Sequence, residues 1–344
     1  MNYEVTIGIP VYNAEKYLRQ TMESALAQSF ENIEFLILDD CGTDSSMSII
    51  LEFQQSHPRG KDIHILHQPH NMGVSAARNR IIDEAQGNFL YFMDADDLIE
   101  PETLSILMSH QRKTGADIVY GSYEKIETYN NNKVVATIQY PLMELKGKGC
   151  LAQYAWSKFG NVQTTIWNFV VEVQLLREAK IRFIETNFWE DMAFAYDLFP
   201  ICNHAVLLPD ITYHYMCRLN SLSRYQQREQ ISKDEVLQNI STINYMKKQC
   251  VHTKMEFYHP QHCLNVLIMA FYVFCYILKN KKMISPSFTN IELRSILIHP
   301  MIISDIMHFK HDRIVHLLFY LVGKFPPKLF VWIISLVGKI KGLI

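Results

Sequence analysis

Apolar and polar positions divide the first hundred residues into short strand-like runs separated by helical segments. The apolar runs are rich in β-branched and aromatic residues, as is typical of strands buried on both faces, and they lie at 5–12, 35–38, 63–67 and 89–93. Between them, apolar residues recur at helical spacing over 15–28, 47–54 and 74–85. Strands that alternate with helices through short turns predict βαβ units. The pattern therefore predicts an α/β fold with a mostly parallel central sheet.

Two of these predicted strands end in aspartates. Asp39-Asp40 follow the second strand, and the fourth strand leads into Asp94-Ala95-Asp96-Asp97. Because parallel strands joined by right-handed crossovers end at the same edge of a sheet, where ligands bind, both acidic pairs are expected to converge there. Crowded carboxylates favour a cation, and their oxygens suit Mg²⁺ or Mn²⁺. The alternative for 94–97 is an acidic helix start, since Pro101-Glu102 follow.

Charge is unevenly distributed along the 344 residues, although the net charge is only −2. Residues 245–344 hold 13 Lys/Arg against 4 Asp/Glu, whereas residues 1–244 hold 20 against 31. A basic, apolar C-terminal region on an acidic body predicts attraction to an anionic surface. The seven cysteines form no C-x-x-C pair, which predicts neither a disulfide framework nor a zinc site and fits a reducing cytosol. Neither a secretory signal nor a membrane-spanning helix is expected.

A second acidic motif lies in the middle of the chain, where Glu190-Asp191 stand between Trp189 and Phe194. Carboxylates beside aromatic surface suit a sugar face and its hydroxyls, and a carboxylate can act as a general base. The alternative is an aspartate at a helix start, where it stabilises the dipole. No G-x-G-x-x-G follows the first strand and no G-x-x-x-x-G-K-[ST] occurs, which disfavours dehydrogenases and P-loop proteins.

Four segments together resemble the ordered signature of family 2 glycosyltransferases with the GT-A fold. They are Pro10-Val11-Tyr12-Asn13, Leu38–Asp44, Asn71–Asn79 and Asp94–Asp97. The second segment departs from the usual Asp-Asp-Gly-Ser at Cys41-Gly42, which leaves the aspartates unchanged. The resemblance implies a GT-A domain over residues 1–225, followed by a helical, basic and apolar region over 226–344.

The resemblance also implies roles for single residues in binding a nucleotide sugar. The backbone at Pro10, Val11 and Tyr12, with Asp39 or Asp40, would hold the nucleobase, and Glu15 and Ala95 belong to the same site. Asp94 would bond ribose hydroxyls, and Asp96 would ligate Mn²⁺ or Mg²⁺ at the diphosphate. Arg78 either contacts the nucleotide or forms an internal salt bridge to one of the aspartates, since a guanidinium suits both.

The same resemblance assigns the chemistry to the second half of the domain. Asp191 matches the general base, and Glu190 would support it or contact the acceptor. The 211–223 segment is similar to a Tyr-Arg…Asn-Ser…Ser stretch, in which Arg218 would neutralise the leaving diphosphate. His214 is a further candidate metal ligand, with packing between two tyrosines as the alternative.

The C-terminal region carries apolar blocks edged by lysines. The blocks at 264–278 and 316–344 are too short to span a bilayer, but they are long enough to lie in its interface with lysines at the headgroups. The alternatives are a helical subdomain that packs these faces internally and, more weakly, nucleic-acid binding. Contact with the inner face of the cell membrane is expected, and a nucleic-acid partner is not.

These features predict an inverting, metal-dependent glycosyltransferase. It would move a hexose or N-acetylhexosamine from a nucleotide sugar, in the first place a UDP-sugar, to a glycan or lipid-linked oligosaccharide in surface polysaccharide synthesis. A nucleotidyltransferase with a similar α/β metal site is one alternative, although residues 9–15 offer no glycine-rich basic loop. A catalytically inactive, membrane-peripheral protein that binds nucleotide sugars is the other.

Overall fold

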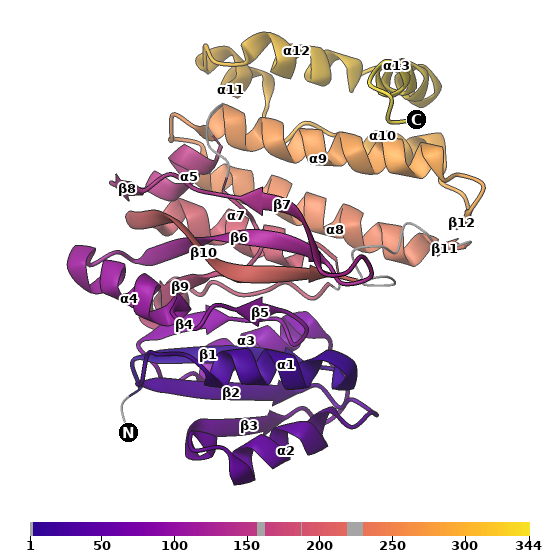
Figure 1. Cartoon of the computed structure of the whole chain (residues 1–344). Helices are drawn as coiled ribbons and strands as arrows, with labels where there is room; N and C mark the ends of the chain where they lie inside the picture. Colours follow the sequence, from indigo (N-terminus) through magenta and orange to yellow (C-terminus); the bar gives the residue numbers. More distant parts are fainter. Residues whose placement is uncertain (1–2, 157–161, 187, 219–229) are drawn as a thin grey trace. The chain divides into compact units, whose positions relative to one another are not determined.

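The computed structural model describes residues 3–156, 162–186, 188–218 and 230–344. The chain divides into two compact units (Figure 1). The first unit comprises residues 1–151 and 164–222, and the second comprises 152–163 and 223–344. The domain bounds predicted from the sequence, 1–225 and 226–344, stay a prediction.

The N-terminal half of the first unit has the βαβ architecture that the sequence predicted. Four parallel strands lie in the order β3-β2-β1-β4. Their bounds are β1 (Val5–Val11), β2 (Ile33–Asp39), β3 (Ile63–His67) and β4 (Phe89–Phe92). The connecting helices are α1 (Glu15–Leu26), α2 (Ser46–Ser56) and α3 (Val74–Glu84), with a short 3₁₀ turn, η1 (Gly60–Asp62), before β3. The carboxyl ends of β2, β1 and β4 therefore lie next to one another.

Gly8 in β1 allows α3 to lie close to the sheet. A Cβ atom at this position would stand 2.4 Å from Cγ2 of Ile81, a residue of α3. That separation is far below ordinary van der Waals contact, so a side chain here would push the helix outward. The glycine thereby fixes the depth at which α3 holds Arg78.

The other half of the sheet is mixed rather than parallel. It continues from β4 through β9, β6 and β10 to β5, and antiparallel pairs outnumber parallel ones in this half. The strands are β5 (Leu98–Ile99), β6 (Ile118–Glu127), β9 (Phe169–Glu172) and β10 (His204–Cys217), with β7 (Lys133–Ile138) and β8 (Met143–Lys146) paired to their sides. The α/β class is confirmed, and the mostly parallel order holds only for the N-terminal half.

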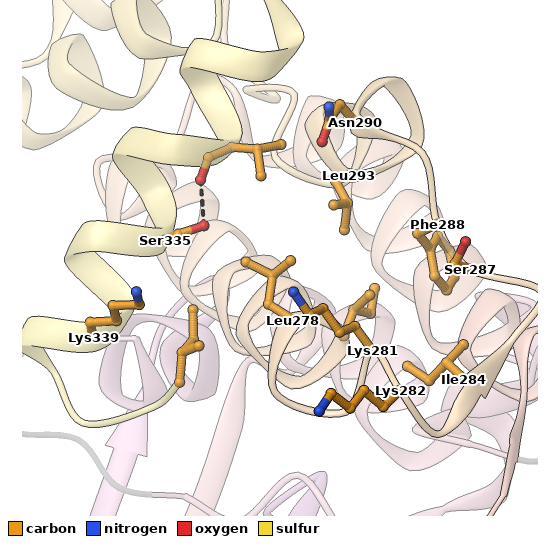
Figure 2. A pocket seen from close by; sticks show the side chains of 13 residues that line it. Leu278, Lys281, Lys282, Ile284, Ser287, Phe288, Asn290, Leu293, Ser335 and Lys339 are labelled. Atoms are coloured by element: carbon orange, nitrogen blue, oxygen red, sulfur yellow. Dashed lines mark hydrogen bonds between the residues drawn. The ribbon is translucent and has the colours of Figure 1, made fainter.

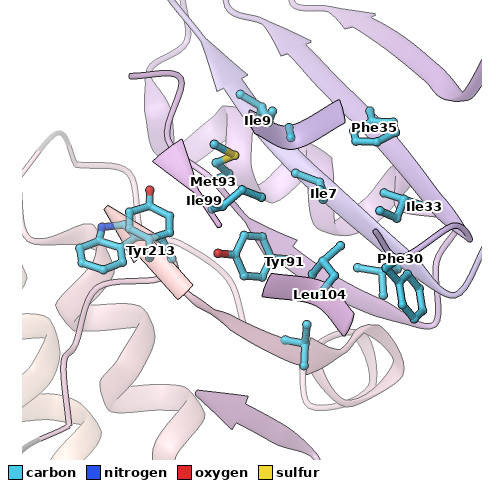
Figure 3. Close-up of a cluster of buried hydrophobic side chains, with 14 of the residues drawn as sticks. Ile7, Ile9, Phe30, Ile33, Phe35, Tyr91, Met93, Ile99, Leu104 and Tyr213 are labelled. Carbon is cyan, nitrogen blue, oxygen red and sulfur yellow. The ribbon is translucent and has the colours of Figure 1, made fainter. Parts of the chain in front are cut away.

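An apolar cluster of the first unit packs strands of the sheet against helices. Ile7, Phe35 and Tyr91 lie on neighbouring strands and are fully buried, and Leu104 of α4 (Thr103–Thr114) packs in the same cluster (Figure 3). The remaining helical elements of the unit are α5 (Cys150–Ala155, which runs into the second unit), α6 (Val173–Glu178), α7 (Glu190–Leu198) and η2 (Phe199–Ile201). This core holds the strand ends that carry the acidic residues.

The second unit is helical, as the sequence predicted for the C-terminal region. Its helices are α8 (Lys233–Gln249), η4 (Cys250–Thr253), α9 (His259–Lys279), α10 (Asn290–Ile296), α11 (Ile303–His308), α12 (Arg313–Val322) and α13 (Pro327–Ile340), and the short strands β11 (Ile231–Ser232) and β12 (Ile284–Ser285) pair in parallel. Helices α8, α10 and α13 all contact α9. Helix α9 therefore forms the centre of this unit.

By length and composition alone, α9 could cross a membrane, although the sequence predicted no such helix. Of its most apolar window, 56% is buried. The buried side faces the neighbouring helices, as the core helix of a helical subdomain does. The internal packing that the sequence kept as an alternative is therefore present for α9.

Four buried or partly buried histidines lie together inside the second unit. Thr253 Oγ1 lies 3.1 Å from His259 Nδ1 and 2.9 Å from His262 Nδ1, and His299 Nε2 lies 3.0 Å from His316 Nδ1. Burial lowers the pKa of His259 to about 4, and lowers those of His262 and His299 to about 3. Burial lowers the pKa of His316 as well. The histidines are therefore neutral in the folded unit at pH 7.

We expect the second unit to lose stability as the pH falls below about 6.5. The unfolded chain takes up protons at the ordinary histidine pKa while the folded unit does not, so stability is complete above that pH and is lost below it. Each such histidine costs roughly 1.4 kcal/mol per pH unit once the pH is well below 6.5. Melting temperatures between pH 7 and 5 measure this slope. The change His262→Gln should flatten the slope, whereas His308→Gln, at an exposed position of α11, should not. Equal slopes in all three proteins would contradict the assignment.

Candidate active site

The site is organised around the guanidinium of Arg78, on α3. Its side chain is only 4% exposed. Nη1 donates to Glu190 and to Asp191, each at 2.7 Å, and Nη2 donates to Asp94 at 3.0 Å. One buried cation thus joins the end of β4 to the first turn of α7. Of the two sequence interpretations of Arg78, the structure has the internal salt bridge, and with three carboxylates rather than one.

Two polar neighbours of Arg78 on α3 hold the segment that leads into α7. Ser75 Oγ donates to the carbonyl oxygen of Thr186 at 2.8 Å. Asn79 makes two bonds of 2.8 Å to the backbone of Phe183, one donated by its side chain and one accepted. No local motif in the sequence connects these two side chains with Glu190-Asp191. Ser75, Arg78 and Asn79 lie at positions i, i+3 and i+4, which places them on one face of a helix. This spacing is the sequence signal that could have grouped them.

Asp191 combines access to solvent with an adjacent cation. Its side chain is 23% exposed. Burial raises the pKa of its carboxyl above the ordinary range; Arg78 opposes the rise, and Glu190 and Asp94 add to it. Because a more basic carboxylate accepts a proton more readily, this environment suits a general base. Asp191 also lies in the first turn of α7, where the helix dipole favours an anion, so the helix-start interpretation holds at the same time.

A second ion pair joins Asp96 to Arg218, the residue after β10. Arg218 Nη1 donates to Asp96 Oδ2, and the guanidinium lies 3.9 Å from the ring centre of Tyr17. Burial raises the pKa of Asp96 to about 6, against the opposing effect of Arg218. The Nε atom of Arg218 is buried and has no acceptor among the described residues. The pair therefore retains an unused donor beside an acidic group that is 43% exposed.

The donor set at this edge fits a divalent ion that binds together with a diphosphate. Asp94 and Asp96 offer hard carboxylate oxygens, and a cation already stands beside Asp96 in the form of Arg218. Within the described ranges, no group of three or more His, Cys, Asp or Glu side chains is arranged to hold a metal by itself. Mg²⁺ commonly takes one or two protein carboxylates and completes its shell with phosphate oxygens and water. The residues present match that mode and not a closed protein cage.

Asp97 and His214 have different surroundings from those of Asp96. Asp97 is fully buried and accepts bonds from the Tyr213 hydroxyl at 2.7 Å and from the Met216 backbone at 2.8 Å, which ties the 94–97 turn to β10. His214 Nε2 instead lies 2.6 Å from Glu100 Oε1. Successive side chains of a strand face opposite sides, so His214 points away from the face of Tyr213. In the structure the contact of His214 is with Glu100, and its role as a metal ligand stays a prediction.

The two aspartates after β2 also differ from each other. Asp40 is 3% exposed, and its two carboxylate oxygens accept the backbone N–H groups of Met72 and Gly73 at 2.8 and 2.9 Å. It therefore fixes the loop that begins α3. Asp39 is partly exposed and lies 2.9 Å from His67 Nδ1. Of the two candidates for the nucleobase, only Asp39 has a carboxylate that a ligand can reach.

The remaining predicted residues lie around the same strand ends. Tyr12, directly after β1, is 50% exposed, whereas Val11 is buried and offers only its backbone. Glu15 Oε2 accepts the Ser45 N–H at 3.0 Å, and the Glu15 N–H donates to Asp44 at 2.9 Å, so this residue links the starts of α1 and α2. Ala95 is buried, and Pro10 is partly exposed on β1. The structure gathers all predicted residues except His214 along one edge of the sheet.

Comparisons with known proteins agree with this architecture. Residues 6–168 match the model of glycosyl transferase family 2. Glycosyltransferase GlyG of Streptococcus pneumoniae serotype 4 is 26% identical over 65% of this chain and 74% of its own length. The E. coli protein WfgD, a UDP-Glc:α-D-GlcNAc-diphosphoundecaprenol β-1,3-glucosyltransferase, is 33% identical over 44% of this chain and 59% of its own length. The chain thus spans less than two thirds of WfgD.

Among solved structures, S. aureus TarS 1–349 in complex with UDP-GlcNAc is similar with a TM-score of 0.63. The similarity covers 93% of this chain and 90% of TarS at 16% sequence identity, so it bears on the fold alone. The fold is GT-A-like, as the sequence predicted. Residues 6–168 are a glycosyl transferase family 2 domain. The relatives named here are glycosyltransferases, and none of them supports the nucleotidyltransferase alternative.

Proposed function

We propose that the protein is an inverting, metal-dependent glycosyltransferase. It would transfer a sugar from a UDP-sugar to a hydroxyl of a glycan or lipid-linked oligosaccharide in surface polysaccharide synthesis. The observation that carries the proposal is the cluster in which Arg78 holds Asp94, Glu190 and Asp191 beside the Asp96–Arg218 pair. One edge of the sheet thereby presents a candidate base together with groups for a diphosphate.

In this proposal the donor lies along the carboxyl ends of β2, β1 and β4. The nucleobase contacts the backbone of 10–12 and the carboxylate of Asp39. The partly exposed oxygens of Asp94 accept bonds from ribose hydroxyls. The unused Nε of Arg218 supplies a donor for a diphosphate oxygen, and a charge-assisted bond of this kind is stronger than a neutral one.

The reaction requires a proton acceptor on one side of the sugar and charge neutralisation on the other. Asp191 takes the proton of the acceptor hydroxyl as its oxygen attacks the anomeric carbon from the face opposite the diphosphate. The bond from that carbon to the diphosphate oxygen breaks, and Arg218 stabilises the charge that develops on UDP. Asp96 would hold Mn²⁺ or Mg²⁺, which when bound neutralises diphosphate charge as a Lewis acid. Arg78 favours the ionised form of Asp191 and holds its carboxylate in place.

The proposed acceptor and cellular location come from the C-terminal region and from the relatives. WfgD acts, by its name, on a diphosphoundecaprenol-linked sugar. The second unit is basic, and α12 and α13 expose Ile314, Leu318, Trp332 and Ile340. Apolar side chains beside lysines suit the interface of an anionic membrane. We therefore place the protein at the inner face of the cell membrane, with residues 1–225 catalysing transfer and 226–344 making the contact. Residues 219–229, which include Asn220, Ser221 and Ser223 of the predicted motif, lie outside the described residues.

We expect Asp96→Ala to abolish the manganese-dependent part of UDP binding. Loss of an outer-shell residue typically weakens metal binding about 10- to 100-fold. Loss of a carboxylate that ligates the metal directly should weaken UDP binding in Mn²⁺ by at least this factor. Isothermal titration with UDP, with and without Mn²⁺, measures the effect. The control is Asp83→Ala, which removes an exposed carboxylate that pairs with Arg182. Unchanged affinity in the Asp96 variant would remove this residue from the metal site.

The same titration tests the wider proposal. If Mn²⁺ has no effect on UDP binding by the wild-type protein, metal dependence is wrong. A panel of nucleotide sugars then identifies the donor by the release of UDP. Release of pyrophosphate from UTP in the presence of a sugar 1-phosphate would indicate the nucleotidyltransferase alternative. Metal-dependent UDP binding without turnover of either kind of substrate would indicate the inactive binding protein.

A further inference from the structure

The second unit contains a cavity of about 590 Å³ that the proposed transfer reaction does not use. Its walls come from the end of α9, the segment that follows it, α10 and α13 (Figure 2). Leu278, Ile284, Leu293 and Val331 make much of the lining apolar. Cavities of this volume are large enough to enclose a small organic molecule or part of a larger one.

Three lysines give the cavity a positive charge. Lys281 and Lys282 follow α9, and Lys339 lies on α13. None of the three pairs with a carboxylate in the part of the chain that the structure describes, and the lining contains no acidic residue. Glu292 of α10 does not neutralise them, because it is held by Lys233 at 2.6 Å. Lys281 and Lys282 also suit the negative end of α9, and Lys339 suits that of α13, but these two helix ends do not explain why all three lysines line one cavity.

Helix α13 connects this cavity to an exposed apolar surface. Val331, Ser335 and Lys339 recur at intervals of four and line the cavity. The residues one position further on form a neighbouring row, and their exposed fractions are 64% for Trp332, 47% for Leu336 and 76% for Ile340. Residues four apart lie on one helix face, and the next row lies about 100° around the helix. A ligand in the cavity would therefore adjoin a surface suited to hydrocarbon.

We propose that this cavity binds the phosphate-bearing headgroup of an anionic membrane phospholipid. The three lysines contact the phosphate, the hydroxyl of Ser287 and the amide of Asn290 offer further donors, and the apolar wall takes the upper part of an acyl chain. Charge complementarity selects an anion, and the apolar lining beside the exposed row of α13 selects an amphiphile over a free ion. The inference rests on the membrane contact proposed above, to which it adds a specific lipid site.

The test measures binding of the full chain to phosphatidylcholine vesicles with and without phosphatidylglycerol, by co-sedimentation. The variant Lys281→Gln/Lys282→Gln/Lys339→Gln should bind the phosphatidylglycerol vesicles roughly 100-fold more weakly, from about fivefold for each lysine. The control is Lys61→Gln/Lys113→Gln/Lys133→Gln, which removes three exposed lysines of the first unit. It should change binding less than about threefold, because those side chains lie on another unit.

A second variant separates the cavity from general surface charge. Ser287→Trp fills the cavity from an exposed position and leaves all three lysines in place, so it should weaken binding to phosphatidylglycerol vesicles at least tenfold. Wild-type binding after Ser287→Trp would mean that the lysines act only as surface charge and would overturn the site. Displacement of the protein from vesicles by millimolar inorganic phosphate at constant ionic strength would overturn it as well, since a free anion would then suffice.

A further measurement distinguishes failure of the lipid site from failure of the transferase proposal. Manganese-dependent UDP binding of each variant is measured on the same samples and should match that of the wild-type protein. A wild-type protein that sediments with neither kind of vesicle would overturn both the lipid site and the membrane contact. If it still binds UDP with Mn²⁺, the transferase proposal stands without them.

Discussion

Replacing Arg78 by methionine should lower the free energy of unfolding by about 3–5 kcal/mol, the cost of removing one partner of a buried ion pair. The loss leaves Asp94, Glu190 and Asp191 partly buried without their shared cation. Methionine keeps much of the aliphatic stem of arginine. The change in the free energy of unfolding therefore comes mainly from the lost charge and not from a cavity. Urea denaturation of the full chain, followed by circular dichroism, measures the change. Transfer activity should be lost in the same variant, because the carboxylates are no longer held together.

The matched control for this prediction is Arg80→Met, two positions along the same helix. The guanidinium of Arg80 donates to the carbonyl oxygen of His67 and to the side chain of Gln68, both neutral acceptors. Its loss should therefore cost no more than about 1 kcal/mol, the net worth of ordinary hydrogen bonds. Lysine at position 78 should not restore the wild-type midpoint, since one ammonium cannot reproduce the planar fork. A wild-type midpoint for Arg78→Met would mean that the three carboxylates need no cation.

The parallel half of the fold was predictable because each element carries its own local pattern. The run at 5–12 is apolar and β-branched enough to be a buried strand in any context, and β1 (Val5–Val11) occupies it. The stripe over 15–28 likewise matches α1. Short turns then leave little choice of topology, because consecutive parallel strands must be joined by right-handed crossovers. Local pattern and chain connectivity therefore agree in this half.

Strand β10 was not predictable in the same way. It contains Pro209, and a proline within an apolar run normally argues against an inner strand. Pro209 lies where the register between β10 and β6 shifts, between Leu207 and Ile211. At such an irregularity the proline does not have to donate a hydrogen bond to the neighbouring strand. Strand β9 was missed because its four residues precede α6 without a break and share its helix-like apolar spacing. Such elements are defined by the neighbours they pair with.

The candidate site likewise contains features that the local sequence predicts and contacts that it does not. The acidic motifs, including the candidate base Asp191, were visible in the sequence because they stand at strand or helix ends and have distinctive residue types. The pairing of Arg78 with Glu190 and Asp191 was not visible in the sequence. These residues lie 112 and 113 positions away from Arg78, and only the tertiary fold brings them to α3. The different surroundings of Asp39 and Asp40 were also hidden, since adjacent residues have the same chemistry in sequence. The difference between Asp39 and Asp40 arises in the fold, where only the carboxylate of Asp40 accepts the backbone N–H groups of residues 72–73.

Asp191→Asn should lower turnover by about 10²- to 10⁴-fold, the usual contribution of a general base. The amide has nearly the shape of the carboxylate and can still accept a bond from Arg78, but it cannot take a proton from the acceptor. UDP binding in Mn²⁺ should stay within about threefold of the wild-type value, because the proposed nucleotide contacts lie on other residues. The rate of UDP release from the preferred UDP-sugar, and UDP affinity by titration, measure the two quantities separately.

Glu190→Gln is the control that distinguishes a base from a charge in the cluster. Glu190 is the neighbour of Asp191 in the first turn of α7, and it bonds the same Nη1 of Arg78 at the same distance of 2.7 Å. The two variants therefore remove one charge each from the same ion-pair network. If the network alone matters, both should lose turnover equally. If Asp191 takes the proton, Glu190→Gln should retain turnover within about tenfold of wild type, well above the loss expected for a missing base. A larger loss in Glu190→Gln than in Asp191→Asn would assign the base to Glu190 instead.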